Sequence, residues 1–379
     1  MKCFSITLIV FVFVVGCSAS PSSTALPSNM GTATPPVITQ ISTPFSSTAT
    51  MSPFPTLPPA PRIASTPSPE LQGLVESGRK AAADGRYEDA LTIFTRVLAA
   101  DAGITDAYNR RAGVYLELGN FPQALADYNR AIALDSKNAS LYSNRAAVAL
   151  NQEKYLQAIE DYNKAIELDS KASHLLVYRG WAYFKAGDIA KATSDYKRAL
   201  ELDPKSGSAY ANRAWFFDKQ GKVAQALDEY NQALVIDPNN AVWLSLRAFA
   251  AFRLGNTAQA TADFKRALEL DAESAIVLNN LCWAMNLGFE WQDAAALDLC
   301  QKAVEKDPRT GGIRDSRGLA RALRGDYPGA IEDFQYFVEW SKRHGEYSEY
   351  GKKREQWIGL LQSGKNPFDA NVLRALREE

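Results

Sequence analysis

The 379-residue sequence has little of what catalytic and metal-binding sites are made of. It holds two histidines and four cysteines, and none lies in a CxxC or HExxH motif or in a cluster with metal-ligand spacing. A GxSxG elbow and a P-loop are also missing. Lys and Arg total 42 against 43 Asp and Glu, so the basic excess typical of nucleic-acid binding is missing as well. We therefore expect no enzyme activity, no cofactor, no metal and no nucleic-acid partner.

Acidic residues are missing from the first 69 positions, where Lys2 and Arg62 are the only charged side chains. Residues 4–15 form an apolar run, FSITLIVFVFVV. As a helix this run would span about 18 Å, which is shorter than the hydrocarbon core of a bilayer at roughly 30 Å. The run therefore favours a cleaved signal peptide over a membrane-spanning anchor.

The apolar run ends in Val-Val-Gly-Cys at residues 14–17, which resembles a bacterial lipobox. By that resemblance, residues 1–17 are a lipoprotein-type signal peptide ending at Cys17, which is lipidated and becomes the mature N-terminus. The alternative is ordinary cleavage after Ala19, since Cys17-Ser18-Ala19 also has small residues at the required positions. The position of Cys17 at the end of the run favours the lipobox.

Residues 18–69 contain 12 Pro, 11 Ser and 9 Thr among 52 positions. Such a segment cannot bury enough apolar surface to offset the entropy lost on ordering, and its prolines favour extended conformations. We expect a disordered Ser/Thr/Pro-rich spacer that holds the rest of the chain away from a membrane.

From Glu70 onward, alanine recurs every 34 residues, with one slip of two residues before the last pair: Ala90, Ala124, Ala158, Ala192, Ala226, Ala260, Ala296 and Ala330. A period of 34 is typical of helix-turn-helix repeats. The period divides the chain into the units 71–104, 105–138, 139–172, 173–206, 207–240, 241–274, 275–310 and 311–344. Positions below are counted from the first residue of each unit.

Each unit resembles the tetratricopeptide repeat (TPR) family, as the fourth shows with Gly180, Tyr183, Gly187, Ala192, Tyr196, Ala199 and Pro204. The resemblance implies an all-α, right-handed α-solenoid of about eight TPR helix-turn-helix units over residues 70–344. Residues 345–379 are then expected to form capping helices that cover the last unit. The helices of a hairpin should cross where Gly180 or Ala214 faces Ala192 or Ala226, because larger side chains would overpack the crossing.

A second regularity pairs charges within the repeat. Arginine holds position 7 in six units, and an acidic residue follows 16 positions later in the same six. The two units that lack the arginine also lack the acid. We expect ion pairs between the two helices of a unit or between neighbouring units. The pairs are Arg111 with Asp127, Arg145 with Asp161, Arg179 with Asp195, Arg213 with Glu229, Arg247 with Asp263, and Arg317 with Asp333.

In TPR arrays, the first helix of each unit lines a concave groove. The resemblance therefore places an aromatic stripe in the groove of the fourth to seventh units, flanked by amides and three cations. The predicted partner-binding residues are Tyr178, Trp181, Phe184, Lys185, Asn212, Trp215, Lys219, Phe249, Phe252, Arg253, Asn280 and Trp283. Exposed aromatic rows mark interaction sites. The alternative is that these rings pack between adjacent helices as core.

Cys282 and Cys300 fall on the two helices of the seventh unit. They could form a disulfide across the hairpin outside the cytoplasm. We favour the alternative, in which they pack as two small apolar side chains.

Together these features predict an extracytoplasmic TPR scaffold, anchored by lipid to a bacterial membrane on its periplasmic or cell-surface side. It would bind a segment of a partner protein in the aromatic groove. The family resemblance implies a role in cell-envelope assembly. The alternative is a glycan-binding module for cell wall, because tryptophan faces also stack on sugar rings.

Overall fold

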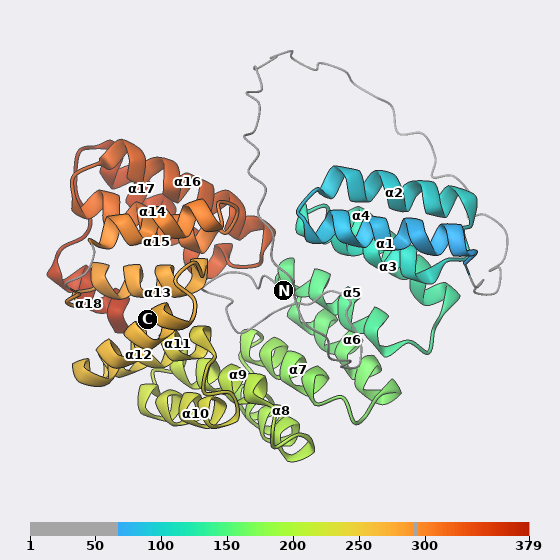
Figure 1. Cartoon of the computed structure of the whole chain (residues 1–379), viewed down its shortest axis with the longest axis horizontal. Coiled ribbons are helices and arrows are strands. Elements are labelled where there is room, and N and C mark those ends of the chain that lie inside the picture. Colours follow the sequence, from blue (N-terminus) through green and yellow to red (C-terminus); the bar gives the residue numbers. More distant parts are fainter. Residues whose placement is uncertain (1–66, 292–294, 379) are drawn as a thin grey trace, which may run out of the picture.

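The computed structural model describes residues 67–291 and 295–378, which are helical throughout apart from short connections (Figure 1). The predicted signal peptide, Cys17 and the spacer up to residue 66 lie outside this range. Sixteen helices make up the repeats: α1 (Pro69–Ala83), α2 (Tyr87–Ala100), α3 (Thr105–Glu117), α4 (Phe121–Leu134), α5 (Ala139–Asn151), α6 (Tyr155–Leu168), α7 (Ser173–Lys185), α8 (Ile189–Leu202), α9 (Gly207–Asp218), α10 (Val223–Ile236), α11 (Ala241–Arg253), α12 (Thr257–Leu270), α13 (Ala275–Asn286), α14 (Ala296–Lys306), α15 (Gly311–Leu323) and α16 (Tyr327–Arg343). The chain continues through a π-helical turn, η1 (Tyr347–Gly351), to α17 (Lys352–Gln362) and α18 (Ala370–Glu378).

Consecutive helices pair into eight hairpins, from α1 with α2 to α15 with α16, and each hairpin packs on the next. The prediction of eight units in an α-solenoid is therefore confirmed. A glycine in the left-handed region turns the chain between the two helices, as at Gly187 (φ 84°) and Gly255 (φ 79°). The third unit has no glycine there, and its Glu153 is the only non-glycine residue with positive φ in the described range.

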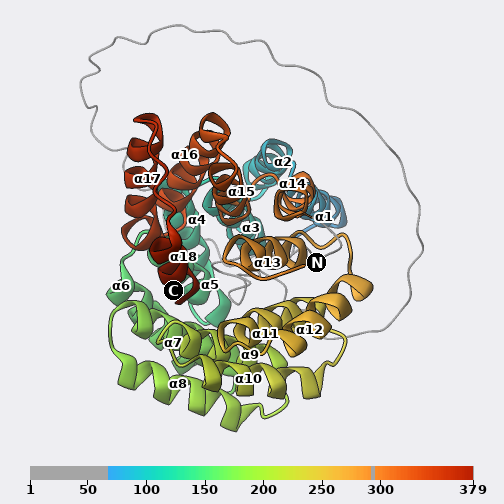
Figure 2. The same ribbon diagram turned by 90° about the vertical axis from the view of Figure 1, so that its left-hand side faces the viewer.

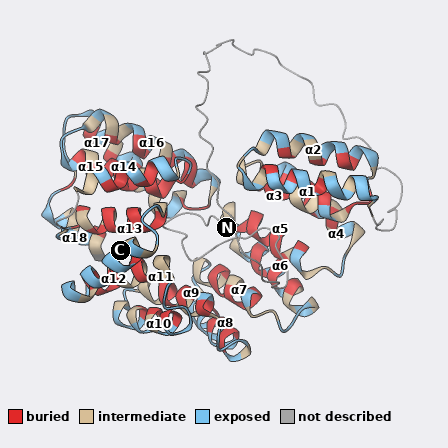
Figure 3. Ribbon diagram, in the orientation of Figure 1, coloured by how far each residue is buried: buried red, intermediate tan, exposed pale blue. Residues whose placement is uncertain are grey.

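Small residues at the helix crossing are required, as the sequence predicted. A Cβ added to Gly180 would lie 3.3 Å from the Cβ of Asp195 and 3.4 Å from the carbonyl oxygen of Ala192. At Gly318 the added carbon would lie 2.8 Å from the ring of Phe334. Figure 3 shows the result, with buried residues on the faces where helices meet. Because the crossing has no spare volume, added methylenes would push the helices apart.

The predicted Arg–acid pairs form within all six hairpins. In five of them the arginine Nε and Nη2 donate to the two oxygens of one aspartate, as Arg179 does to Asp195 at 2.8 and 2.7 Å. The third nitrogen, Nη1, reaches back to the preceding unit in the same five cases; Arg179 donates to Asn163 at 2.8 Å. The ion pairs are therefore those between the two helices of one unit, and the same arginine is joined to the unit before it by a hydrogen bond to a neutral side chain. We call these six pairs the arginine ladder.

The array curves so far that its two ends meet. Figure 1 shows the first units opposite the last ones, and Figure 2 shows α1 and α2 beside α14 and α15. The guanidinium of Arg309, after α14, lies 5.3 Å from the ring centroid of Tyr87 and donates to the carbonyl oxygen of Gly85. Arg343, at the end of α16, packs against Gly119 of the second unit. The first two units are consequently in direct contact with the last two.

The residues after α16 cover the last unit, as predicted. The ring of Trp357 on α17 lies 5.5 Å from that of Phe334 on α16, and Phe368 packs on Trp357 at 4.8 Å. Trp357 is 5% exposed. These residues therefore seal the apolar face that an end unit would otherwise leave open.

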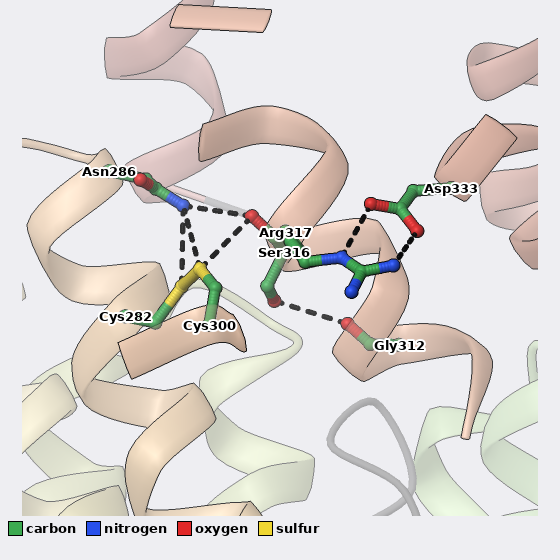
Figure 4. Close-up of a disulfide and its surroundings, with 7 residues drawn as sticks. All are labelled: Cys282, Asn286, Cys300, Gly312, Ser316, Arg317 and Asp333. Carbon is green, nitrogen blue, oxygen red and sulfur yellow. Dashed lines mark hydrogen bonds and ion pairs between the residues drawn. A yellow bond between two sulfur atoms is a disulfide. The ribbon is translucent and has the colours of Figure 1, made fainter. Parts of the chain in front are cut away.

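Cys282 and Cys300 are joined by a disulfide between α13 and α14, with Cα atoms 5.5 Å apart (Figure 4). The favoured expectation of two unpaired cysteines is therefore wrong, and the disulfide alternative holds. Beside the bond, the buried Asn286 donates to the carbonyl oxygen of Ser316 on α15 at 3.0 Å. Within the described residues, no helix has the length and apolar character needed to cross a membrane.

Candidate binding site on the concave face

The twelve predicted groove residues all lie on, or directly after, four consecutive first helices, α7, α9, α11 and α13. Figure 1 shows these helices along the inner side of the curved array. The structure brings five of the predicted residues together around one cavity: Trp215, Lys219, Phe249, Asn280 and Trp283. The predicted placement on one side of neighbouring first helices therefore agrees with the structure, whereas the predicted exposure does not.

Trp181 and Trp215, the two central indoles, are only 3% and 8% exposed, and Phe252 is 4% exposed. The Trp181 and Trp215 ring centroids lie 4.3 Å apart with planes inclined by 63°, and Phe184 packs against both. The expectation of an open aromatic stripe is therefore wrong for these residues. Rings from successive first helices interlock edge to face, a favourable arrangement that hides both faces of each ring. Phe249 and Trp283 are partly exposed.

The predicted flanking amides and one of the three cations are engaged inside the array. Asn212 donates to the carbonyl oxygen of Ser208 in its own helix at 2.8 Å. Asn280 donates to the hydroxyl of Ser245 at 2.9 Å. Both side chains are also buried, so they are not open contact points for a partner, contrary to the expectation from the sequence.

Arg253 pairs with Asp218 of the preceding unit at 2.5 Å, and its side chain is 3% exposed. A cation at this depth needs an internal carboxylate to offset desolvation. Arg253 is therefore part of the packing between the fifth and sixth units and not an open contact point.

Residues that follow the array enter its concave side, which the sequence did not predict. Lys185 forms an ion pair with Glu349, and Lys219 donates to the hydroxyl of Tyr350 at 2.7 Å. The backbone N–H of Ser348 donates to the carboxylate of Glu153 at 3.3 Å. The η1 turn thus touches the third, fourth and fifth units in succession.

Two arginines hold the two helices that follow this turn, α17 and α18. Arg354 of α17 donates to both oxygens of Asp315 on α15, at 2.9 and 2.6 Å, and both side chains are buried. Arg377 of α18 donates to the carbonyl oxygen of Phe252 at 2.7 Å and lies 4.0 Å from the centroid of its ring. Both helices that follow the turn are therefore joined to the array.

Between α9, α11, α13, α15 and the C-terminal segment lies a cavity of about 130 Å³. Besides the predicted residues given above, it is lined by Asp218, Asp315, Tyr350 and Arg354. The cavity combines aromatic walls with charged groups, a pattern that suits ligand side chains more than bulk solvent. Within the described residues, no group of three or more His, Cys, Asp and Glu could hold a metal ion.

The charges at the η1 contact respond to burial and to each other. Burial lowers the pKa of Lys219, while the nearby carboxylates of Glu349 and Asp218 act in the opposite direction. For Glu349, burial acts to raise the pKa, but Lys185 and hydrogen bonds outweigh it, and the net pKa is below the usual value. Glu349 is therefore ionised at neutral pH and attracts both lysines.

Sequence reasoning missed Asp218, Asp315, Tyr350 and Arg354. For the contacts between neighbouring first helices, a signal was present as a separation of 35 residues, one more than the period. Three pairs show it: Asn109 with Asn144, Asp218 with Arg253, and Ser245 with Asn280. No periodic signal points to Tyr350, because it lies outside the repeats.

Sequence models of this repeat match four stretches, described as "TPR repeat" for residues 112–153 and as "Tetratricopeptide repeat" for 139–171, 178–241 and 244–274. The chain is a tetratricopeptide-repeat protein. As TPR proteins generally bind protein or peptide partners, this TPR protein is a protein–protein interaction scaffold.

A comparison with curated protein sequences finds no match. Among solved structures, a tetratricopeptide repeat protein from Parabacteroides merdae ATCC 43184 is 16% identical, with a TM-score of 0.48, and the match covers 78% of this chain and 100% of that one. A thermophilic TPR protein from Thermus thermophilus is 25% identical, with a TM-score of 0.43 and 48% and 99% coverage. Pseudomonas aeruginosa pilF is 20% identical, with a TM-score of 0.43 and 55% and 94% coverage.

Proposed function

We propose that this TPR protein is an extracytoplasmic adaptor in the assembly of a bacterial cell envelope. Its concave face holds a segment of a partner protein, and a lipid on Cys17 anchors it to the membrane. The observation that carries the proposal is the contact of Lys185 and Lys219 with the η1 turn. A surface that already binds a peptide segment of its own chain has the shape and charge to bind one from another chain.

The two lysines suit this role because of their surroundings. The Nζ of Lys185 lies 5.1 Å from a ring centroid of Trp181, and that of Lys219 lies 5.6 Å from Trp215. The buried indoles hold the lysine stems in place and stabilise the ammonium groups by cation–π attraction. A partner therefore meets two pre-oriented cations, which lowers the entropy lost on binding.

The N-terminal part of the proposal rests on the sequence alone. A lipidated Cys17 followed by a spacer of 52 residues would let the array reach on the order of 150 Å from the membrane if the spacer were extended. This arrangement suits an adaptor that searches for partners within an envelope.

The burial of the groove tryptophans disfavours the glycan-binding alternative. Sugar rings stack on open indole faces, and Trp181 and Trp215 offer almost none at 3% and 8% exposure. Of the three predicted groove tryptophans, only Trp283 is partly exposed.

Photo-crosslinking in the native host tests concave binding. The photoreactive p-benzoylphenylalanine replaces Phe249, a partly exposed aromatic of the cavity wall, or, as a control, Leu156, which is 75% exposed and lies on α6. We expect a discrete protein adduct from position 249 and none of the same mass from position 156. Equal adducts from both positions, or no adduct from position 249, would contradict the proposal.

A separate variant tests the anchor. Cys17→Ser should move the chain from the membrane fraction to the soluble fraction and remove labelling by a radioactive fatty acid. If the variant stays with the membrane and the wild type takes up no label, the lipid anchor is wrong.

A further inference from the structure

The η1 turn presents two adjacent side chains to two successive units of the array. Glu349 meets Lys185 of the fourth unit, and Tyr350 meets Lys219 of the fifth. The two lysines stand 34 residues apart at the same position of the repeat. Lys219 also lies 5.1 Å from the centroid of the Tyr350 ring, so it contacts both the hydroxyl and the aromatic face. The same position in two successive units therefore binds a carboxylate and a phenol that are adjacent in the sequence.

We propose that the concave face recognises a partner segment in which an acidic residue is followed directly by a tyrosine, and that Glu349 and Tyr350 occupy this site until the partner displaces them. The inference rests on the proposed function, because it names the chemistry of the segment that the adaptor binds. The pair Glu349-Tyr350 is then an intramolecular competitor.

The turn can leave its site while the helices on both sides stay in place. Its contacts with the repeats include those of the two lysines, the hydrogen bond from Ser348 to Glu153, and the packing of Tyr350 in the cavity that Trp215 also lines. The flanking α17 is held instead by the buried pair of Arg354 with Asp315 and by Trp357. A π-helical turn is also rare and is frequently found at functional sites. Displacement therefore breaks the contacts of the turn itself and leaves the buried pair of Arg354 with Asp315 intact.

An internal competitor reduces the apparent affinity for a partner by the fraction of time for which the site is open. If the turn occupies the site for about nine-tenths of the time, opening it raises the affinity about tenfold. This gain is measurable without knowledge of the natural partner, because the chain's own sequence supplies a probe.

The probe is a dye-labelled synthetic peptide of residues 345–351, GEYSEYG, and its binding to the full chain is measured by fluorescence polarisation. The double variant Glu349→Gln/Tyr350→Phe weakens the internal contact but leaves the lysines intact. The matched control is Glu167→Gln, which breaks an exposed Lys164–Glu167 ion pair on α6. We expect the double variant to bind the peptide about tenfold more tightly than the wild type and the control to match the wild type.

The increase in peptide affinity must depend on Lys185 and Lys219. Adding Lys185→Met and Lys219→Met to the double variant should abolish peptide binding, since methionine keeps most of the apolar stem but removes the charge. The probe holds two Glu-Tyr pairs, Glu346-Tyr347 and Glu349-Tyr350. A peptide with glutamine and leucine in place of both pairs should bind at least about tenfold more weakly. Equal affinity of wild type and double variant, binding that ignores the lysines, or no binding to the double variant would each overturn the proposal.

A second variant opens the site without touching Glu349 or Tyr350. Gly345 has φ 67°, and a Cβ there would lie 2.6 Å from the carbonyl oxygen of Leu150. Gly345→Ala should therefore push the start of the turn off α5 and raise peptide affinity as the double variant does. If Gly345→Ala has the circular dichroism spectrum of the wild type and also binds the peptide with wild-type affinity, the displacement of the turn is wrong.

The crosslinking experiment separates the two proposals. If position 249 gives an adduct in cells but the peptide binds wild type and double variant equally, the adaptor function stands and the internal competitor is wrong. If the peptide assay succeeds but position 249 gives no adduct, the competitor stands and the adaptor function fails.

Discussion

One pair of the arginine ladder, Arg213 with Glu229, has one hydrogen bond in place of two. Its acidic residue is a glutamate, which is one methylene longer than the aspartate of the other five pairs. Arg213 makes one hydrogen bond to Glu229, from Nη2 to Oε1 at 2.8 Å. The Nε of Arg213 and the Oε2 of Glu229 are buried and have no hydrogen-bond partner. In the other five pairs an aspartate accepts both hydrogen bonds, as Asp195 does from Arg179. We predict that Glu229→Asp restores the second bond and stabilises the protein.

The expected size follows from the burial of the pair. A hydrogen bond between charged groups contributes roughly 1.5–3 kcal/mol when it is buried, but the Arg213 and Glu229 side chains are 24% and 14% exposed, so solvent weakens the gain. We expect the free energy of unfolding to rise by about 1 kcal/mol. Burial also raises the pKa of Glu229 because its contact with Arg213 does not offset the desolvation. The reverse change, Asp195→Glu, should cost about as much as Glu229→Asp gains.

Urea titration followed by circular dichroism at about 222 nm measures both variants, with an unchanged slope as the sign that only stability has changed. A double-mutant cycle assigns the effect: in an Arg213→Ala background, Glu229→Asp should give no gain. The reasoning is refuted if Glu229→Asp is neutral or destabilising, or if it stabilises equally when Arg213 is absent.

Three further predictions concern the core, the closure of the ring and the disulfide. Trp215→Ala should lower the free energy of unfolding by about 3–5 kcal/mol because the indole is buried; a loss below about 1 kcal/mol in urea titration would show that the ring is not core. Glu117 ends α3 and is near enough to Arg309, at the closure of the ring, to be influenced by its charge. Burial raises the pKa of Glu117 to about 7, so the folded state binds a proton more tightly than the unfolded state. Its stabilising contribution is therefore complete below about pH 4 and is lost as the pH rises through about 7. The urea midpoint of the wild type should accordingly fall between about pH 5 and pH 8 relative to that of Glu117→Gln, and parallel profiles would exclude this titration. Reduction with dithiothreitol should cost the wild type about 2–4 kcal/mol but leave Cys282→Ala/Cys300→Ala unchanged; an equal response of both proteins would remove the disulfide as the cause.

The sequence predicted those features that repeat at short range along the chain. The 34-residue step placed eight hairpins because each unit must bury its apolar face on the next. The 16-residue step from Arg179 to Asp195 placed the arginine ladder because both residues recur in register in six units. Local pattern and three-dimensional contact coincide in these cases, since a repeat mainly touches itself and its neighbours.

What the sequence did not predict comes from contacts across many units. Glu349 lies 164 residues from Lys185, and Tyr350 lies 131 residues from Lys219. No period connects them, because the turn that carries Glu349 and Tyr350 is not a repeat. The interlocking of Trp181 with Trp215 follows from the angle between neighbouring first helices, which the residue pattern alone does not specify. The exposure of the groove was therefore overestimated, although its residues were placed on the correct helices.

The structure also explains why only two of the three predicted groove cations are available to the η1 turn. Lys185, Lys219 and Arg253 share one position of the repeat, but the residue that lies 35 positions earlier differs among them. That residue is Leu150 for Lys185 and Phe184 for Lys219, neither of which can accept a hydrogen bond through its side chain. For Arg253 it is Asp218, which forms the buried ion pair. The acidic residue removes the third cation from the groove, so the specificity of the concave face is set between units as well as within them. A substitution of the residue that lies 35 positions before a cation, and not only of the cation itself, would then extend or shorten the cationic row.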